Sequence, residues 1–123
     1  MSDIYREHIL DHFRNPRHKG RLQKATASYE AWNPLCGDKL VFDVLVENGK
    51  LQDIAYEGEG CAISLAAASI LSEAISGLHV EEIKKISYDD MLKLLKIPLT
   101  PARLKCGTLA LDGVKAALKT MEV

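Results

Sequence analysis

The spacing of apolar residues predicts a helix at the start of the chain. Between Asp3 and Arg14 the apolar positions Tyr5, Ile9 and Phe13 recur every fourth residue. This is the spacing of one stripe on a short amphipathic helix, and we expect that stripe to be its packing face. Asn15–Pro16 should end the helix, because a residue before proline disfavours the helical conformation.

A β-hairpin is expected next, after a mixed segment from Ala25 to Trp32 to which the pattern assigns no element. Leu40–Glu47 is rich in β-branched residues, and Leu51–Glu57 returns as a second strand. Between them lies Asn48–Gly49, whose residues tolerate the positive φ angles of a type I′ turn. The sequence therefore predicts a small antiparallel sheet.

The second half of the chain has helical patterns. Alanines and serines from Ala62 to Ser76 predict a helix that can pack closely, with Gly77 as its C-terminal cap. Two short helices are expected at Val80–Lys85 and Asp89–Leu95, the second with Ser87 as a capping candidate.

A last helix is expected from about Pro101, which suits a first helical position, to about Lys119. Its predicted apolar stripe consists of Leu104, Leu111, Val114 and Leu118. Helices combined with a small antiparallel sheet indicate the α+β class.

Composition narrows the class of protein. The 123 residues are 47% hydrophobic, which suits one domain spanning residues 1–123. The 16 basic and 17 acidic residues are interspersed and aromatics are only 6%, which argues against a nucleic-acid binder. The charged N-terminus does not resemble a signal peptide and no apolar run could span a membrane, so we expect a cytoplasmic protein. Three cysteines in a reducing compartment favour metal or sulfur chemistry over disulfides.

Each cysteine has a glycine neighbour: the pairs are Cys36–Gly37, Gly60–Cys61 and Cys106–Gly107. Only eight glycines occur in the chain, so this pairing is unlikely to be accidental. Glycine allows the backbone to approach a ligand closely. Cys36 and Asp38 lie two residues apart in a turn-rich segment, so a thiol and a carboxylate can point at one centre.

The other two cysteines lie at helix starts or beside cations. Cys61 directly precedes the predicted Ala62 helix, whose N-terminus favours thiolate over thiol. Cys106 falls early in the last helix, between Arg103 and Gly107 and next to Lys105. Three thiolates with Asp38 as an oxygen ligand would suit zinc or a [2Fe–2S] cluster, and the weaker oxygen ligand would ease cluster release. The alternative is that each cysteine is a small buried apolar residue.

Other residues carry weaker signals. His8 and His12 are four apart, a spacing that suits a metal ligand pair but is more typical of a solvated or partner-facing stripe. Lys105 is either an assistant, which holds Cys106 as thiolate or pairs with Asp38 when no metal is present, or a solvated helix lysine. Trp32 is interpreted as a core anchor.

The chain resembles the iron–sulfur cluster assembly scaffold family of IscU, SufU and the N-terminal domain of NifU. The motifs that carry the resemblance are Asp11-His12-Phe13-Arg14-Asn15-Pro16-Arg17, Asn33-Pro34-Leu35-Cys36-Gly37-Asp38, Glu57-Gly58-Glu59-Gly60-Cys61-Ala62-Ile63-Ser64 and Arg103-Leu104-Lys105-Cys106-Gly107-Thr108-Leu109-Ala110. The resemblance implies an α+β fold with a three-stranded antiparallel sheet packed against several helices. It also implies that Cys36, Asp38, Cys61 and Cys106 are the ligands of zinc or a transient [2Fe–2S] cluster.

The resemblance further implies that a cysteine desulfurase supplies sulfur and that apo-proteins receive the cluster. Lys105 replaces the histidine of IscU-type members, and the IscU-type chaperone motif is absent at Pro98–Arg103. SufU-type members share the motifs around Cys61 and Cys106 but usually carry an insertion between them, which this chain lacks. We therefore expect SufU-like motifs on a body of IscU size.

Three functions are compared on this basis. The first is a non-enzymatic scaffold that assembles a cluster, and the second is a zinc-dependent sulfur acceptor or transferase of the SufU type. In both, Cys36 and Cys106 are the candidate persulfide acceptors, with Lys105 as a possible assistant. The third is a binding module whose zinc only stabilises the fold. A homodimer remains open.

Overall fold

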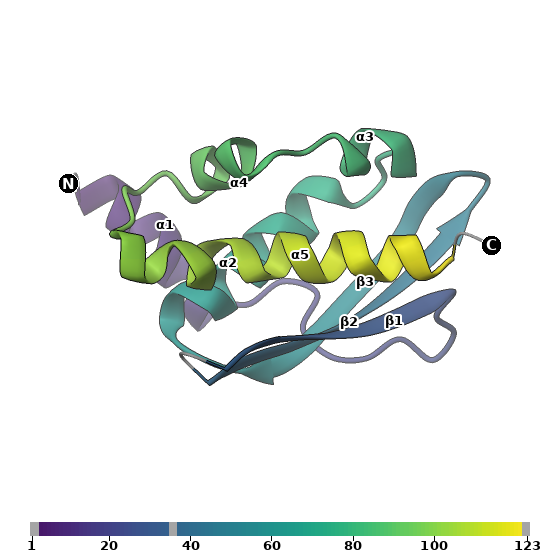
Figure 1. Cartoon of the computed structure of the whole chain (residues 1–123), viewed down its shortest axis with the longest axis horizontal. Coiled ribbons are helices and arrows are strands. Elements are labelled where there is room, and N and C mark those ends of the chain that lie inside the picture. The colour runs from purple at the N-terminus through teal and green to yellow at the C-terminus, as the bar shows by residue number, and fades with distance from the viewer. Residues whose placement is uncertain (1–2, 35–36, 122–123) are drawn as a thin grey trace.

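The computed structural model describes residues 3–34 and 37–121, which include a three-stranded antiparallel sheet in the order β1-β2-β3. The strands are β1 (Ala27–Asn33), β2 (Asp38–Glu47) and β3 (Lys50–Glu59). The helices are α1 (Asp3–Arg14), α2 (Ala62–Ile75), α3 (Val80–Lys84), α4 (Tyr88–Leu95) and α5 (Leu104–Thr120), and a 3₁₀ turn over Pro101–Arg103 leads into α5. The predicted α+β class with a three-stranded sheet is confirmed (Figure 1).

The hairpin between β2 and β3 forms as predicted. Asn48 and Gly49 have φ angles of 55° and 76°, as a type I′ turn requires. Both strands are longer than predicted at the end away from this turn, where Lys39 pairs with Glu59. This extra length carries Asp38, the first residue of β2, to the place where β3 leads into Cys61. The hairpin therefore brings two predicted site residues together.

The strand β1 covers the segment to which the sequence pattern assigned no element. It pairs antiparallel with β2, with Trp32 opposite Lys39. Ala31 and Asn33 are buried, whereas the side chain between them is 65% exposed. Successive residues of a strand point to opposite faces, so Trp32 must point away when its neighbours point inward. The interpretation of Trp32 as a core anchor is therefore wrong.

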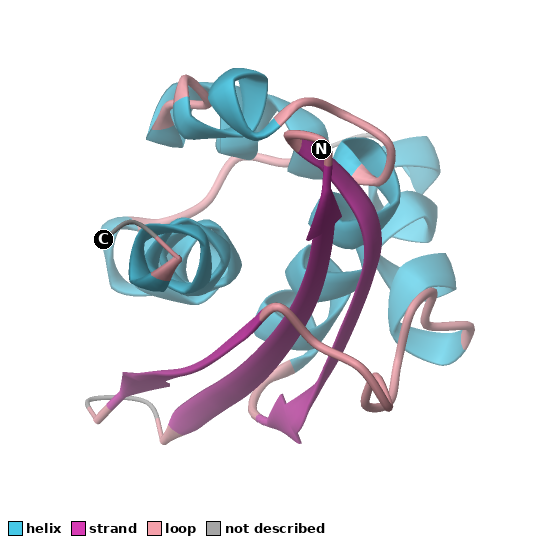
Figure 2. Ribbon diagram, turned by 90° about the vertical axis from the view of Figure 1, so that its right-hand side faces the viewer, coloured by secondary structure: helices cyan, strands magenta, loops and turns pink. Residues whose placement is uncertain are grey.

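The helix α5 packs directly on the sheet, against β1 and β2 (Figure 2). A Cβ atom on Gly113 would lie 2.9 Å from the Phe42 ring and 3.1 Å from the Ala31 Cβ, so glycine permits this close approach. The predicted stripe residues Leu111, Val114 and Leu118 are buried in the core. Leu104 differs, at 38% exposed, because it lies in the first turn of α5 and lines a surface hollow.

The remaining helices form close to their predicted bounds. Gly77 has a φ of 89° directly after α2 and its cap Ser76, as expected for a C-terminal glycine. Ser87 caps α4 by accepting a hydrogen bond from the Asp90 N–H at 3.1 Å, and α4 begins one residue earlier than predicted. Within residues 3–34 and 37–121, none of the helices has the length and apolar character needed to cross a membrane.

The helix α1 packs against α2, but not through the whole predicted stripe. Ile9 is buried, whereas Phe13 is 42% exposed and His12 takes the inward position, 4% exposed. An α-helix turns by about 100° per residue, so a spacing of four overshoots one full turn by about 40°. The side chain of Tyr5 lies outside the described residues.

His12 is held by a buried hydrogen bond. Its Nδ1 lies 2.8 Å from the Ser69 Oγ on α2, and the Nε2 of His8 lies 3.2 Å from the Leu94 carbonyl oxygen. The solvated or partner-facing role that the spacing favoured is therefore wrong for His12. No group of metal ligands found in the described part of the chain includes either histidine.

Burial lowers the pKa of His12, and the nearby Arg17 and His8 act in the same direction. The folded state therefore disfavours the protonated ring, while the unfolded chain takes up the proton below about pH 6.5. We expect the free energy of unfolding to fall as the pH drops from about 7.5 to 5.5. The slope, measured by urea denaturation, should be shallower in His12→Asn. His79→Asn, at an exposed position, should keep the wild-type slope. Equal pH slopes of the unfolding free energy in all three proteins would contradict the role of His12 in this pH dependence.

Candidate metal centre

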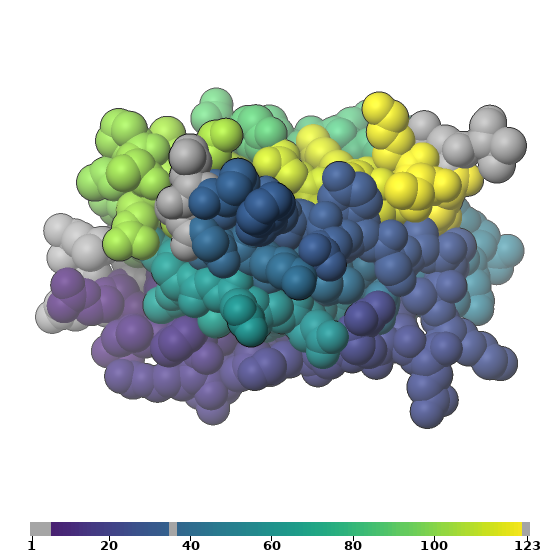
Figure 3. All heavy atoms as spheres, turned by 60° about the horizontal axis from the view of Figure 1, so that its bottom comes forward, coloured from purple at the N-terminus to yellow at the C-terminus, as the bar shows by residue number. Residues whose placement is uncertain are grey.

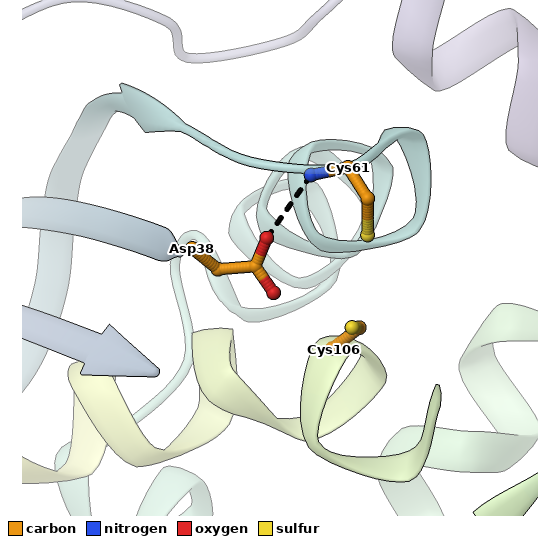
Figure 4. A group of neighbouring side chains, drawn as sticks. All are labelled: Asp38, Cys61 and Cys106. Carbon is orange, nitrogen blue, oxygen red and sulfur yellow. Dashed lines mark hydrogen bonds between the residues drawn. The ribbon is translucent and has the colours of Figure 1, made fainter. Parts of the chain in front are cut away.

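Three predicted site residues converge from three separate elements. One carboxylate oxygen of Asp38 and the sulfurs of Cys61 and Cys106 all lie within 4.8 Å of one another (Figure 4). Asp38 starts β2, Cys61 directly precedes α2, and Cys106 is the third residue of α5. Cys36, the fourth predicted ligand, lies outside the described residues.

The carboxylate of Asp38 is fully buried, and only one of its oxygens is satisfied. Oδ1 accepts a hydrogen bond from the Cys61 backbone N–H at 3.0 Å, which ties β2 to the start of α2. Oδ2 is buried and has no hydrogen-bond partner within the described part of the protein. A buried charged oxygen without a partner is costly, so native proteins seldom leave one. A cation in this position would satisfy it.

A second buried carboxylate in the same sheet shows the contrast. Asp43 is 1% exposed, and each of its oxygens has two donors. Arg21 donates to both oxygens at 2.6 and 3.0 Å, Ser28 donates to one at 2.6 Å, and the Leu22 N–H donates at 3.0 Å. The hydrogen bond from Arg21, with those from Ser28 and Leu22, lowers the pKa of Asp43 to about 2. Asp43 is thus internally satisfied, whereas Asp38 has one oxygen available for a ligand.

Cys61 is the N-cap residue of α2 and is partly exposed. Its sulfur lies 3.7 Å from the Ser64 Oγ, and that hydroxyl donates to the Cys61 carbonyl at 3.0 Å. Burial raises the pKa of the Cys61 thiol, but hydrogen bonds from Ser64 and Cys106 outweigh burial and lower the pKa overall. The direction agrees with the thiolate predicted at this helix start.

Cys106 is fully buried, and of its two cationic neighbours Arg103 is the one that contacts the thiols. A side-chain hydrogen bond with Cys106, helped by the charges of Cys61 and Cys106, raises the pKa of the Arg103 guanidinium. The side chain of Lys105 instead lines a separate surface hollow. Residues three apart share a helix face, so the spacing from Arg103 to Cys106 could have singled out the arginine. The assisting role of Lys105 stays a prediction.

The glycine beside Cys61 allows Asp38 and Ser64 to approach the backbone closely. A Cβ atom on Gly60 would lie 2.6 Å from the Asp38 Oδ1 and 2.5 Å from the Ser64 Oγ. At Gly107 a Cβ atom would lie 2.5 Å from Leu99 Cδ1 and 3.0 Å from Leu95 Cδ1. The expected close approach is therefore found at Gly60, whereas Gly107 allows close helix packing.

The donor set suits a metal. Thiolates are preferred ligands of zinc and of iron–sulfur clusters, and a carboxylate oxygen is an accepted fourth zinc ligand. Two such sulfurs and one unpartnered oxygen meet here from β2, α2 and α5. The group therefore suits metal binding.

Known proteins are similar to this chain along almost its whole length. The profile of the NifU-like N terminal domain matches residues 4–123. The zinc-dependent sulfurtransferase SufU of Bacillus subtilis is 35% identical, in an alignment that covers 99% of this chain and 94% of that protein. The iron–sulfur cluster assembly scaffold protein IscU of Aquifex aeolicus is 34% identical, over 97% of this chain and 76% of that protein.

The two alignments differ in length. The one with SufU runs over 139 positions, more than the 123 residues of this chain, so SufU has residues that this chain lacks. The one with IscU runs over 121 positions. This difference agrees with the expected body of IscU size.

Solved structures share the fold. A crystal structure described as a candidate SUF-system cluster assembly scaffold from Fervidobacterium islandicum has a TM-score of 0.81 at 27% identity, covering 91% of this chain and 94% of that one. A NifU-like N-terminal structure from Brucella abortus has a TM-score of 0.82 at 24% identity, covering 98% of this chain and 95% of that one. The second shows the shared fold alone.

Gly60→Ala tests whether the close approach matters for metal binding. The added Cβ would push Asp38 or Ser64 aside, so we expect the unfolding free energy to fall by about 1–3 kcal/mol. We also expect zinc affinity, measured by competition with a chromogenic chelator, to fall at least about tenfold. Gly77→Ala is the control. An alanine at the Gly77 φ of 89° would strain the backbone, but at a position far from the site. It should lose stability but keep zinc affinity, and equal zinc affinity in both variants would contradict the role of Gly60.

Proposed function

The chain belongs to the NifU-like N-terminal domain family of iron–sulfur cluster assembly proteins, and from this premise we propose that it acts as a sulfur-accepting scaffold. It accepts sulfur from a cysteine desulfurase and holds a transient [2Fe–2S] cluster or zinc. It then passes the cluster to apo-proteins. The ligands are Cys36, Asp38, Cys61 and Cys106.

The observation that carries the proposal is the unpartnered oxygen of Asp38 beside two cysteine sulfurs. Asp43 supplies the reference, because a buried carboxylate that only stabilises the fold has donors on both oxygens. Asp38 keeps one oxygen without a donor in the described part of the protein, and that oxygen is buried. A bound metal ion would supply positive charge there and keep the cysteines as thiolates.

Sulfur transfer requires one of the cysteines to act as a nucleophile. Its thiolate attacks the outer sulfur of the donor persulfide, a new S–S bond forms, and the donor cysteine leaves as thiolate. No electrons are exchanged with a third partner in this step. Cys36 and Cys106 are the proposed acceptors, and full burial of Cys106 means that it must become exposed before it can react.

A zinc-dependent sulfur acceptor that relays sulfur without building a cluster is the second candidate. The relative named as a zinc-dependent sulfurtransferase covers 99% of this chain, which favours it. The two candidates are separated by anaerobic incubation with iron, cysteine, the host's desulfurase and a thiol reductant. A visible chromophore that Cys61→Ser abolishes supports the scaffold. Desulfurase stimulation by zinc-loaded protein without a chromophore supports the relay.

Asp38→Asn should separate metal binding from stability. The amide keeps an oxygen to accept the Cys61 N–H and removes the buried charge, so we expect metal-free stability to change by less than about 1 kcal/mol. Zinc affinity should fall at least about tenfold, because one charged ligand is lost. Asp53→Asn, at an exposed position of β3, should leave both quantities unchanged. Wild-type zinc affinity in Asp38→Asn would remove this carboxylate from the ligand set.

Removing the metal should leave the chain folded. Among the described residues, the core cluster of Leu40, Phe42, Leu71, Leu111 and other buried apolar side chains contains none of Asp38, Cys61 and Cys106, and a chain of about 120 residues can be stable on its own core. After dialysis against a chelator we expect the helical circular dichroism signal and a cooperative urea transition to remain. Loss of both would favour zinc that only holds the fold together.

A further inference from the structure

A surface hollow of about 480 Å³ lies beside the candidate metal centre, and the proposed function does not use it. It is lined by the end of β1, by α4 and by the first turns of α5. Figure 3 shows the end of β1 (dark blue) and the start of α5 (light green) on one face of the molecule. Lys105 lines the hollow and is adjacent in the chain to Cys106, so a molecule seated there lies next to the site.

Exposed apolar side chains concentrate at this hollow. Trp32, Tyr88 and Leu104 are 65%, 56% and 38% exposed, and all three line it. The two other large exposed apolar residues found in the described chain, Phe13 and Tyr29, lie elsewhere. Tryptophan and tyrosine at the centre of protein interfaces contribute much of the binding energy. The concentration therefore indicates a protein-binding surface.

The charged residues of the hollow indicate which kind of side chain would bind there. Asp89 and Asp112 line it, and Asp112 accepts a hydrogen bond from the Tyr88 hydroxyl at 2.6 Å, which holds the ring in place. Two carboxylates beside an aromatic surface fit a lysine or arginine next to an apolar residue. Among the described residues that line the hollow, Lys105 is the one cation, and it suits an anionic sulfur close to Cys106.

We propose that this hollow is the docking surface for the sulfur-donating desulfurase, which inserts an apolar side chain flanked by a lysine or arginine. The inference rests on the proposed function, since it concerns the partner of the same site. The desulfurase is favoured over other partners because its reactive sulfur must reach the cysteines while its surface covers their surroundings. A donor anchored in the hollow would present its persulfide beside Lys105 and Cys106.

Trp32 is the only tryptophan in the chain, so it reports directly on the hollow. Zinc-loaded protein labelled with 5-fluorotryptophan should give one fluorine resonance. We expect this resonance to shift or broaden when the unlabelled desulfurase of the host is added, and to stay unchanged with serum albumin. Desulfurase binding seen by calorimetry without a change at Trp32 would overturn the inference.

Variants then measure the contribution of the hollow to affinity. Trp32→Ala and Tyr88→Ala should each weaken desulfurase binding about tenfold, while Tyr29→Ala, an exposed aromatic of the same strand, should change it less than about twofold. Asp112→Asn should weaken binding several-fold at low salt and less at high salt, because the attraction is screened. Glu47→Gln, near the distant hairpin, is the charge control. Zinc content and circular dichroism should be unchanged throughout.

The outcomes separate the inference from the function on which it rests. If the wild-type protein neither binds the desulfurase nor accepts sulfur, both fail together. If the wild type binds and the hollow variants bind equally well, only the docking surface is wrong. If the Trp32 resonance changes on concentrating the protein alone, and light scattering shows a dimer that Trp32→Ala dissociates, the occupant is a second copy and the inference is overturned.

Discussion

The buried carboxylate of Asp38 is the feature on which the candidate metal centre depends. One oxygen caps the start of α2 through the Cys61 N–H, and the other has no donor within the described residues. The first contact ties the Cys61 backbone to the start of β2, and the second oxygen is open to a further partner such as a metal ion. The same side chain therefore both positions the start of α2 and contributes an oxygen to a group that suits metal binding.

The hairpin and two glycines bring the residues of the site together. The β2–β3 hairpin places Asp38 beside Gly60, and Gly60 has no Cβ that would collide with the carboxylate. Gly113 lets α5 approach the sheet closely, which carries Cys106 to the same point. The apolar core cluster found in the described residues includes none of Asp38, Cys61 and Cys106.

Two cationic residues near Cys106, Arg103 and Lys105, contact different surroundings. Arg103 faces the cysteines, three positions before Cys106, while Lys105 lines the neighbouring hollow with Trp32 and Tyr88. Arg103, the last residue of the 3₁₀ turn, and Lys105, the second residue of α5, thus lie at different places, one at the thiols and the other at the hollow. The described residues that line the hollow and those of the candidate metal centre therefore do not overlap.

The convergence of Asp38, Cys61 and Cys106 was expected from the glycine-flanked cysteines and the family resemblance, but packing between β2, α2 and α5 brings it about. The sequence by itself determined the hairpin turn and the helix bounds to within a residue or two, except that α5 begins at Leu104, three residues after the predicted start. Those features depend on local rules: Asn48–Gly49 adopts positive φ, Ser87 caps a helix, and glycines accompany the thiols. Only the tertiary structure decided that β1 forms at the edge, that Trp32 points outward, and that His12 rather than Phe13 faces α2. The tertiary structure also decided that Asp43 has donors on both oxygens and Asp38 on only one within the described residues. Whether a buried carboxylate finds donors depends on residues far away in the chain. Local pattern fixes conformation, but the partners of a side chain are set by packing between elements.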